Sequence, residues 1–213
     1  MSVNASGNTR EPARPDVNKT FDAQKEARIN EIAGLPVPEA FERLKTAEYL
    51  SNPDLMYKTI SRAFSYRKKD TLTFARNYLR SPLTEVVGGR VISRLKEFTV
   101  AKRIFEIFPE DATPMLVSLY ERGDAVTKGN IIQAAGNMAG GGEIRKLMIR
   151  ALDDTSAYEE ENPDSPGEPL RICDVAYNQL VLRYTITNVL RTISPLHSIA
   201  TRDYHIAILK GML

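Results

Sequence analysis

Amphipathic segments that end at prolines, glycines or aspartates follow one another along most of the 213-residue chain. Within each segment, apolar residues recur at the three- and four-residue spacing that places them on one face of an α-helix. The clearest segments lie between residues 111 and 153, where one stops at Gly123 and the next starts at Asp124 and stops at Gly140-Gly141-Gly142. Because no alternating run is bounded by Asn-Gly or Asp-Gly turns, we expect no paired strands and an all-α fold.

Prolines and capping residues predict where the helices of the N-terminal half begin. Pro36 and Pro38 are expected to stop one helix and open the next, and Asn52-Pro53 reads as an N-cap followed by a first-turn proline. Ser81-Pro82 is predicted to open a helix that carries Val86, Val87, Val91, Ile92 and Leu95. In this interpretation Gly88-Gly89 is a site of close helix packing or a kink inside that helix.

Composition shifts divide the chain into an arm and one folded domain. Residues 1–20 are polar and charged, with few sizeable apolar side chains, so we expect a flexible arm. Residues 21–213 are predicted to form a single domain. Within it, residues 154–169 form an acidic loop rich in Pro, Ser and Gly. Residues 185–213 form a C-terminal cap, whose last helix is expected to start at Thr201-Arg202-Asp203.

The segment 112–154 resembles HEAT and related armadillo-type repeats. Its matching features are Pro114 opening a first helix, the Gly123-Asp124 turn, the small residues Ala134-Ala135-Gly136, and the closing Leu152-Asp153-Asp154 turn. The predicted starts of the second helices lie roughly 40 residues apart, the length of a HEAT unit. The closing region also resembles the C-terminal ends of bacterial HEAT-repeat proteins of unassigned role. The resemblance implies a right-handed superhelix, or solenoid, of antiparallel helix pairs with a concave binding face.

The residue types that carry chemistry do not form a catalytic or metal-binding pattern. Cys173, Asp174 and His197 could make a Cys-His-Asp site, but Cys173 lies in an apolar helical segment, where a thiol is usually an inert small side chain. We interpret Asp174 as a carboxylate that satisfies backbone N–H groups of a neighbouring loop. Two histidines and one cysteine provide no zinc spacing, and the triple glycine lacks a phosphate-binding motif. We therefore expect no enzyme activity, cofactor or metal.

Basic charge is concentrated between residues 53 and 103, in a chain whose formal net charge is only +2. The residues predicted to bind a partner are Lys58, Arg62, Arg90 and Arg94. We expect these arginines in successive second helices, which line the concave face of a solenoid. One interpretation is a groove for an anionic partner; the other is a solvated face, partly compensated by the acidic loop.

These observations predict a non-enzymatic scaffold or adaptor that binds a protein or peptide on its concave face. The alternative is binding of nucleic acid or another polyanion through the basic 53–103 region. HEAT-like alkylpurine DNA glycosylases bind DNA, but their site uses tryptophans and this chain has none. The chain has no apolar run long enough for a membrane helix and no apolar leader, so we expect a cytoplasmic protein. A mature secreted or periplasmic fragment would have the same features, and the oligomeric state stays open.

Overall fold

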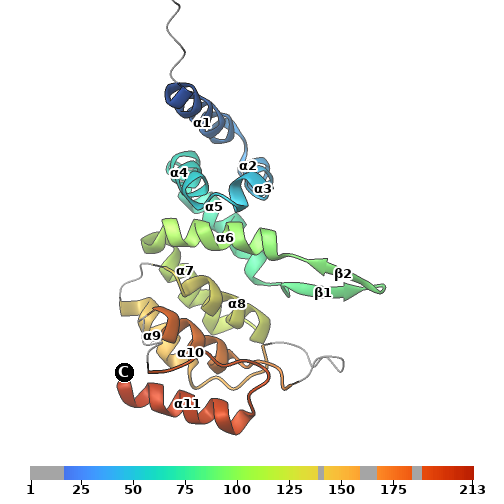
Figure 1. Cartoon of the computed structure of the whole chain (residues 1–213), viewed down its shortest axis with the longest axis vertical. Helices are drawn as coiled ribbons and strands as arrows, with labels where there is room; N and C mark the ends of the chain where they lie inside the picture. The colour runs from blue at the N-terminus through green and yellow to red at the C-terminus, as the bar shows by residue number, and fades with distance from the viewer. Residues whose placement is uncertain (1–16, 139–141, 159–166, 184–188) are drawn as a thin grey trace, which may run out of the picture.

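The computed structural model describes residues 17–138, 142–158, 167–183 and 189–213, and this part of the chain is mostly helical (Figure 1). The helices of the N-terminal half are α1 (Val17–Gly34), α2 (Val37–Leu44), α3 (Ala47–Leu50), α4 (Pro53–Phe64), α5 (Lys68–Ala75) and the 3₁₀ helix η1 (Arg76–Leu79). Those of the C-terminal half are α6 (Leu95–Ile107), α7 (Pro109–Arg122), α8 (Ala125–Ala135), α9 (Gly142–Ala151), α10 (Ile172–Arg183) and α11 (Ile199–Met212). The predicted all-α character is thus confirmed, apart from one small hairpin described below.

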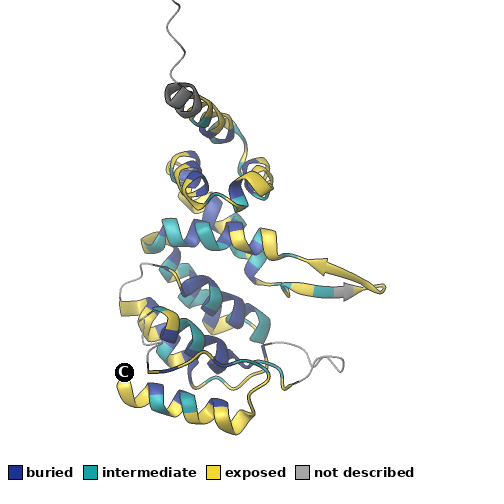
Figure 2. Ribbon diagram, viewed as in Figure 1, coloured by how far each residue is buried: buried dark blue, intermediate teal, exposed yellow. Residues whose placement is uncertain are grey.

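The helices are stacked along the long axis of the molecule, with α1 at one end and α11 at the other (Figure 1). Helix α1 packs on α4, α4 and α5 on α6, α6 on α8, α8 on α10, and α10 on α11. The apolar side chains turned inward by these contacts join into one buried cluster along the stack (Figure 2). Each layer is therefore in contact with the layers directly above and below it in the stack.

Side-chain caps start several of the helices. Asn52 Oδ1 accepts from the backbone N–H of Leu55 at 3.0 Å, and Asp124 Oδ1 accepts from that of Thr127 at 2.8 Å. Both caps confirm the sequence prediction. At the C-terminus the cap is Ser198, whose Oγ accepts from the Thr201 backbone N–H at 3.2 Å, so the predicted start at Thr201-Arg202-Asp203 is wrong.

Two predicted helix boundaries in other parts of the chain are also wrong. Helix α7 begins at Pro109, which needs no N–H in a first turn, and it continues through Pro114, which was expected to start it. At the other end of the molecule, residues 17–20 of the predicted arm already belong to α1. The rest of that arm lies outside the described residues.

The region 84–93 is an antiparallel β-hairpin and not a helix. Strand β1 (Thr84–Val87) pairs with β2 (Arg90–Ser93) in a register that places Val87 opposite Arg90. The two residues between the strands, Gly88 and Gly89, have φ values of 57° and 75°. Positive φ at both central positions matches a type I′ turn, whose twist suits a two-residue hairpin. The predicted helix after Ser81-Pro82 and the predicted kink at the glycines are therefore wrong.

The hairpin projects sideways from the helical stack at the level of α6 (Figure 1). Its side chains remain accessible, as shown by exposed fractions of 50% for Val87 and 69% for Val91. Its base is fixed by the buried Asn130 of α8, which donates to the carbonyls of Leu79 at 3.0 Å and Ser81 at 2.9 Å. Thus α8 fixes the position at which η1 ends and the hairpin leaves the stack.

Candidate functional site

A cavity of about 650 Å³ opens between η1, the C-terminal half of α7 and the start of α8. Its lining residues are Arg76, Arg80, Met115, Ser118, Leu119, Arg122, Gly123, Asp124 and Thr127. The lining thus combines three arginines and one aspartate with apolar side chains from α7. It brings together two residues of the predicted basic region and a third arginine from outside that region.

The three arginines of the cavity differ in their partners. Arg122 folds back along α7, where its Nε donates to the Ser118 carbonyl at 3.2 Å and its Nη2 contacts the Ser118 hydroxyl. Arg76 Nε is shielded from solvent, and within the described ranges this nitrogen has no hydrogen-bond partner. Arg80 follows η1 and is exposed. Since water cannot reach this N–H, it is not open to a ligand either, and Arg76 contributes to the cavity through its charge as a lining residue.

Asp124 is the one acidic residue of the lining, and its carboxylate is engaged by the protein. It caps α8, and its hydrogen bonds with Thr127 hold the pKa of this carboxyl below its usual range. It therefore carries a negative charge at neutral pH. With three arginines against one aspartate, the cavity has an excess of positive charge.

The apolar part of the cavity comes from Met115 and Leu119, one turn apart on α7. Both side chains are partly buried and pack against the main core. They give the cavity a surface for methylene groups beside the guanidinium groups. The arrangement is suited to hold an anionic group with an aliphatic stem, and its position is set by η1 and α7.

None of the four residues predicted to bind a partner lines this cavity. Lys58 and Arg62 lie on α4, Arg90 lies on β2, and Arg94 is at the N-cap of α6. The expected placement of the arginines in successive second helices is therefore wrong for Arg90 and Arg94. Figure 1 shows α4 and the hairpin on opposite sides of the stack, so the four do not form one patch.

Ion pairs within the stack neutralise part of the predicted basic region. Arg62 pairs with Glu26, Arg94 Nη2 lies 3.3 Å from Glu85 Oε2, and Arg103 Nη1 lies 2.6 Å from Glu106 Oε2. Arg67 instead donates to the carbonyls of Ala63, Leu35 and Ala33, so it joins α4 to the end of α1. Arg62 and Arg67 connect to α1, whereas the pair of Arg103 and Glu106 lies within α6, and each of the three ion pairs sets a carboxylate beside an arginine of the basic region.

The acidic loop does not supply the expected compensation in its described residues. Asp153 pairs with Lys210 of α11 at 2.6 Å, and Asp154 pairs with Lys128 of α8 at 3.0 Å. Residues 159–166 lie outside the described part of the chain. The described acidic residues therefore bind C-terminal helices and not the region 53–103.

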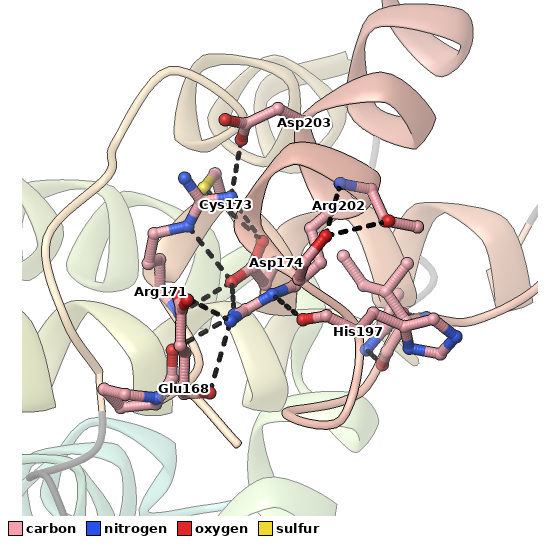
Figure 3. A network of polar contacts seen from close by, with 12 residues as sticks. Glu168, Arg171, Cys173, Asp174, His197, Arg202 and Asp203 are labelled. Carbon is pink, nitrogen blue, oxygen red and sulfur yellow. Dashed lines mark hydrogen bonds and ion pairs between the residues drawn. The ribbon is translucent and has the colours of Figure 1, made fainter.

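A second group of polar residues joins α10 to α11 (Figure 3). The carboxylate of Asp174 is fully buried and accepts from the Arg171 backbone N–H at 2.9 Å, from Arg171 Nη2 at 2.9 Å and from Arg202 Nη1 at 2.6 Å. Arg202, also fully buried, donates further to the carbonyls of His197, Pro169 and Glu168. The one backbone N–H bound by Asp174 is that of Arg171, directly before α10 and outside the loop 154–169, so the predicted bonds to the N–H groups of a neighbouring loop are not found among these contacts. These contacts satisfy the buried charges and identify the group as structural.

The Cys-His-Asp arrangement considered from the sequence is not assembled. His197 is exposed, and its Nδ1 accepts from the Ser194 backbone N–H at 3.0 Å, so only its carbonyl reaches the network (Figure 3). Cys173 is 1% exposed, and burial raises the pKa of its thiol to about 11. The interpretation of Cys173 as a buried, neutral thiol is confirmed.

The described residues contain neither a cluster of metal-binding side chains nor a membrane-spanning helix. In those ranges, no group of three or more His, Cys, Asp or Glu side chains is placed to hold a metal ion. Among the described helices, none has the length and apolar character to span a membrane.

The structure thus defines a stack of helices with one arginine-lined cavity as its best candidate site. No family model matches the chain, and neither the curated proteins nor the solved structures contain a significant match to it. The functional argument therefore depends on the geometry of the cavity itself.

Proposed function

We propose that this protein is a non-enzymatic, HEAT-like helical-repeat scaffold that binds a segment of a partner protein in the cavity between η1, α7 and α8. The right-handed superhelical arrangement implied by the repeat resemblance is part of this proposal. Support comes from the stacked helices and from the part of the repeat pattern in the segment 112–154 that is kept: the turn at Gly123-Asp124, the small residues at the end of α8 and the turn after α9. Pro114 lies inside α7 and does not contribute. Helical repeats present extended surfaces that bind other chains.

The observation that carries the proposal is the cavity. Its volume of about 650 Å³ lies inside the range of roughly 300–1,000 Å³ typical of ligand sites, and its lining mixes apolar and charged side chains. A peptide needs both kinds of surface, because its backbone and side chains combine polar and apolar groups. The position of the site on regular helices keeps it formed in the absence of a ligand.

Nucleic-acid binding through the region 53–103 stays a competing prediction. It requires many cationic side chains along one surface, since each phosphate contact contributes a small part of the affinity. The separation of α4 from the hairpin reduces the support for such a surface (Figure 1). A peptide segment, in contrast, needs only the cavity.

Selection of binders from a random peptide display library tests the proposal. Wild-type protein is expected to enrich a related set of peptides, and Ser118→Trp is expected to lose them, because the indole would occupy the cavity. The control is Ala207→Trp, at an exposed position of α11 near the far end of the stack. Failure of the wild type to enrich any peptide, or equal enrichment by both variants, would contradict the proposed function.

A further inference from the structure

Arg76 differs from the other arginines of the cavity because part of its guanidinium is both shielded and unsatisfied. Its Nε has no partner among the described residues, although the atom is inaccessible to solvent. The groups that cover this N–H also keep a ligand oxygen from it, so Arg76 acts on a ligand through the positive charge that its guanidinium brings to the cavity wall. Arg80, one helical turn further on, also lines the cavity and adds a second positive charge.

We propose that the cavity selects acidic peptide segments, with an Asp or Glu carboxylate of the ligand bound by Arg76 and Arg80. The inference rests on the proposed function, since it names the chemical class of segment that the same site binds. The planar guanidinium matches a carboxylate with two parallel hydrogen bonds, which a lysine at this place would not provide. Met115 and Leu119 receive the methylene groups of the acidic side chain or of its neighbours.

The apolar part of the lining distinguishes a carboxylate on an aliphatic side chain from a bare, more highly charged anion. Asp124 stays ionised at neutral pH and repels every anion in the cavity. Because three arginines outnumber Asp124, charge alone attracts a phosphate group with nearly two charges more strongly than a carboxylate with one. A carboxylate side chain gains in addition the contact of its methylene groups with Met115 and Leu119, which inorganic phosphate lacks. A nucleic-acid strand also requires a continuous row of cations, whereas Arg62, Arg94 and Arg103 are held in ion pairs.

Fluorescence anisotropy with fluorescein-labelled hexaglutamate, and with hexaglutamine as the uncharged control, tests this inference. Wild-type protein is expected to bind hexaglutamate and to bind hexaglutamine at least about tenfold more weakly, since charge-assisted hydrogen bonds contribute most of the affinity. Absence of hexaglutamate binding up to millimolar protein, or equal binding of the two peptides, would overturn the inference.

Four variants locate the binding. Arg76→Gln is expected to weaken hexaglutamate binding about tenfold or more, the loss typical of a charged hydrogen bond. Arg191→Gln, at an exposed position between α10 and α11, makes the same change in net charge and is expected to leave the affinity nearly unchanged. Equal losses in these two variants would show non-specific attraction and overturn the inference. Arg76→Lys keeps the charge and is expected to lose most of the affinity, which separates hydrogen bonding from charge.

A gain of affinity is expected for Asp124→Asn. Asparagine caps a helix as well as aspartate does, so α8 keeps its N-cap while the cavity loses its negative charge. The affinity for hexaglutamate is expected to rise roughly fivefold, as befits removal of one nearby like charge at a partly exposed site. An unchanged or weaker affinity in this folded variant would place the peptide outside the cavity.

Competition identifies the class of ligand and separates the two proposals. The competitors are unlabelled hexaglutamate, unlabelled duplex DNA of 20 base pairs and inorganic phosphate, each added to the complex with labelled hexaglutamate. If DNA or phosphate displaces the labelled peptide more effectively than unlabelled hexaglutamate does, the choice of a carboxylate is overturned. If the display selection enriches peptides that Ser118→Trp loses, and these carry no excess of Asp or Glu, the proposed function stands and this inference fails. If no peptide is enriched, the proposed function itself fails.

Discussion

Truncation of the buried carboxylate of Asp174 isolates the interaction that fixes α11 to the rest of the stack. In Asp174→Ala, the fully buried guanidinium of Arg202 loses the oxygen that lies 2.6 Å from its Nη1, and Arg171 loses one of its two carboxylate partners, the one at 2.9 Å. Removal of one member of a buried, hydrogen-bonded ion pair leaves an uncompensated charge and costs about 3–5 kcal/mol. This is a large part of the roughly 5–15 kcal/mol that stabilises a typical domain.

The matched control is Asp203→Ala. Asp203 accepts from the same Arg171 at 2.6 Å, but its side chain is 56% exposed, so its loss is expected to cost about 1 kcal/mol or less. Urea unfolding at pH 7, followed by circular dichroism, gives both free energies of unfolding. A cost below about 1 kcal/mol for Asp174→Ala, or costs that do not differ between the variants, would refute the assignment of a structural role to this network.

The same carboxylate makes stability depend on pH. Burial alone would raise the pKa of Asp174, but the hydrogen bonds from Arg171 and then Arg202 outweigh burial and lower it. The contribution of this carboxylate to the free energy of unfolding is therefore complete above its unfolded-state pKa of about 4. It is lost as the pH falls below that value toward the lowered pKa of the native state. Asp174→Asn is expected to flatten this part of the curve of unfolding free energy against pH. An identical acid limb in wild type and variant would contradict the explanation.

Three further predictions concern packing, reactivity and the hairpin. Gly129→Ala places a methyl group 2.0 Å from the ring of Tyr158 and is expected to lower the free energy of unfolding in urea by about 1–3 kcal/mol. In the control Gly211→Ala the added methyl group meets no atom within 4 Å, so this variant is expected to be neutral. Equal effects of the two substitutions would contradict the packing. Cys173 is expected to react with a thiol reagent only as fast as the protein opens, and rapid labelling of the native protein would contradict its burial. Gly89 has a φ of 75°, a conformation that alanine rarely adopts, so Gly89→Ala is expected to speed amide hydrogen exchange in the hairpin. The unfolding midpoint of the helices is expected to stay the same. Unchanged exchange in the hairpin would contradict the turn geometry.

Local signals in the sequence predict the helices well where capping and periodicity agree. Asp124 and Asn52 are both followed by a regular apolar stripe, and each caps the expected helix. Prolines are less informative, because Pro109 and Pro114 both lie in α7 and only the packing of the helix selects the first as its start. Gly88-Gly89 indicates a packing site only when it is considered alone; together with the β-branched residues on both sides it indicates the turn of a hairpin.

The candidate site could be predicted only in part, because the chain brings its residues together from distant positions. Arg76 and Arg80 belong to the basic region noticed in the sequence, but Arg122 lies on α7 and no local pattern connects it to them. The number of basic residues also overestimates how many are available to bind a partner. Arg67 donates to the Leu35 carbonyl, and Arg62 forms an ion pair with Glu26. The unsatisfied Nε of Arg76 depends on side-chain packing, which periodicity does not describe.

The central claim is that an acidic segment binds in the cavity between η1, α7 and α8. The most direct test is a titration of ¹⁵N-labelled protein with hexaglutamate, followed by backbone amide chemical shifts. The account predicts shifts concentrated at residues 76–80 and 115–127, with the hairpin and α4 unaffected. Shifts spread over the surfaces of α4 and β2, or no shifts at saturating peptide, would contradict it.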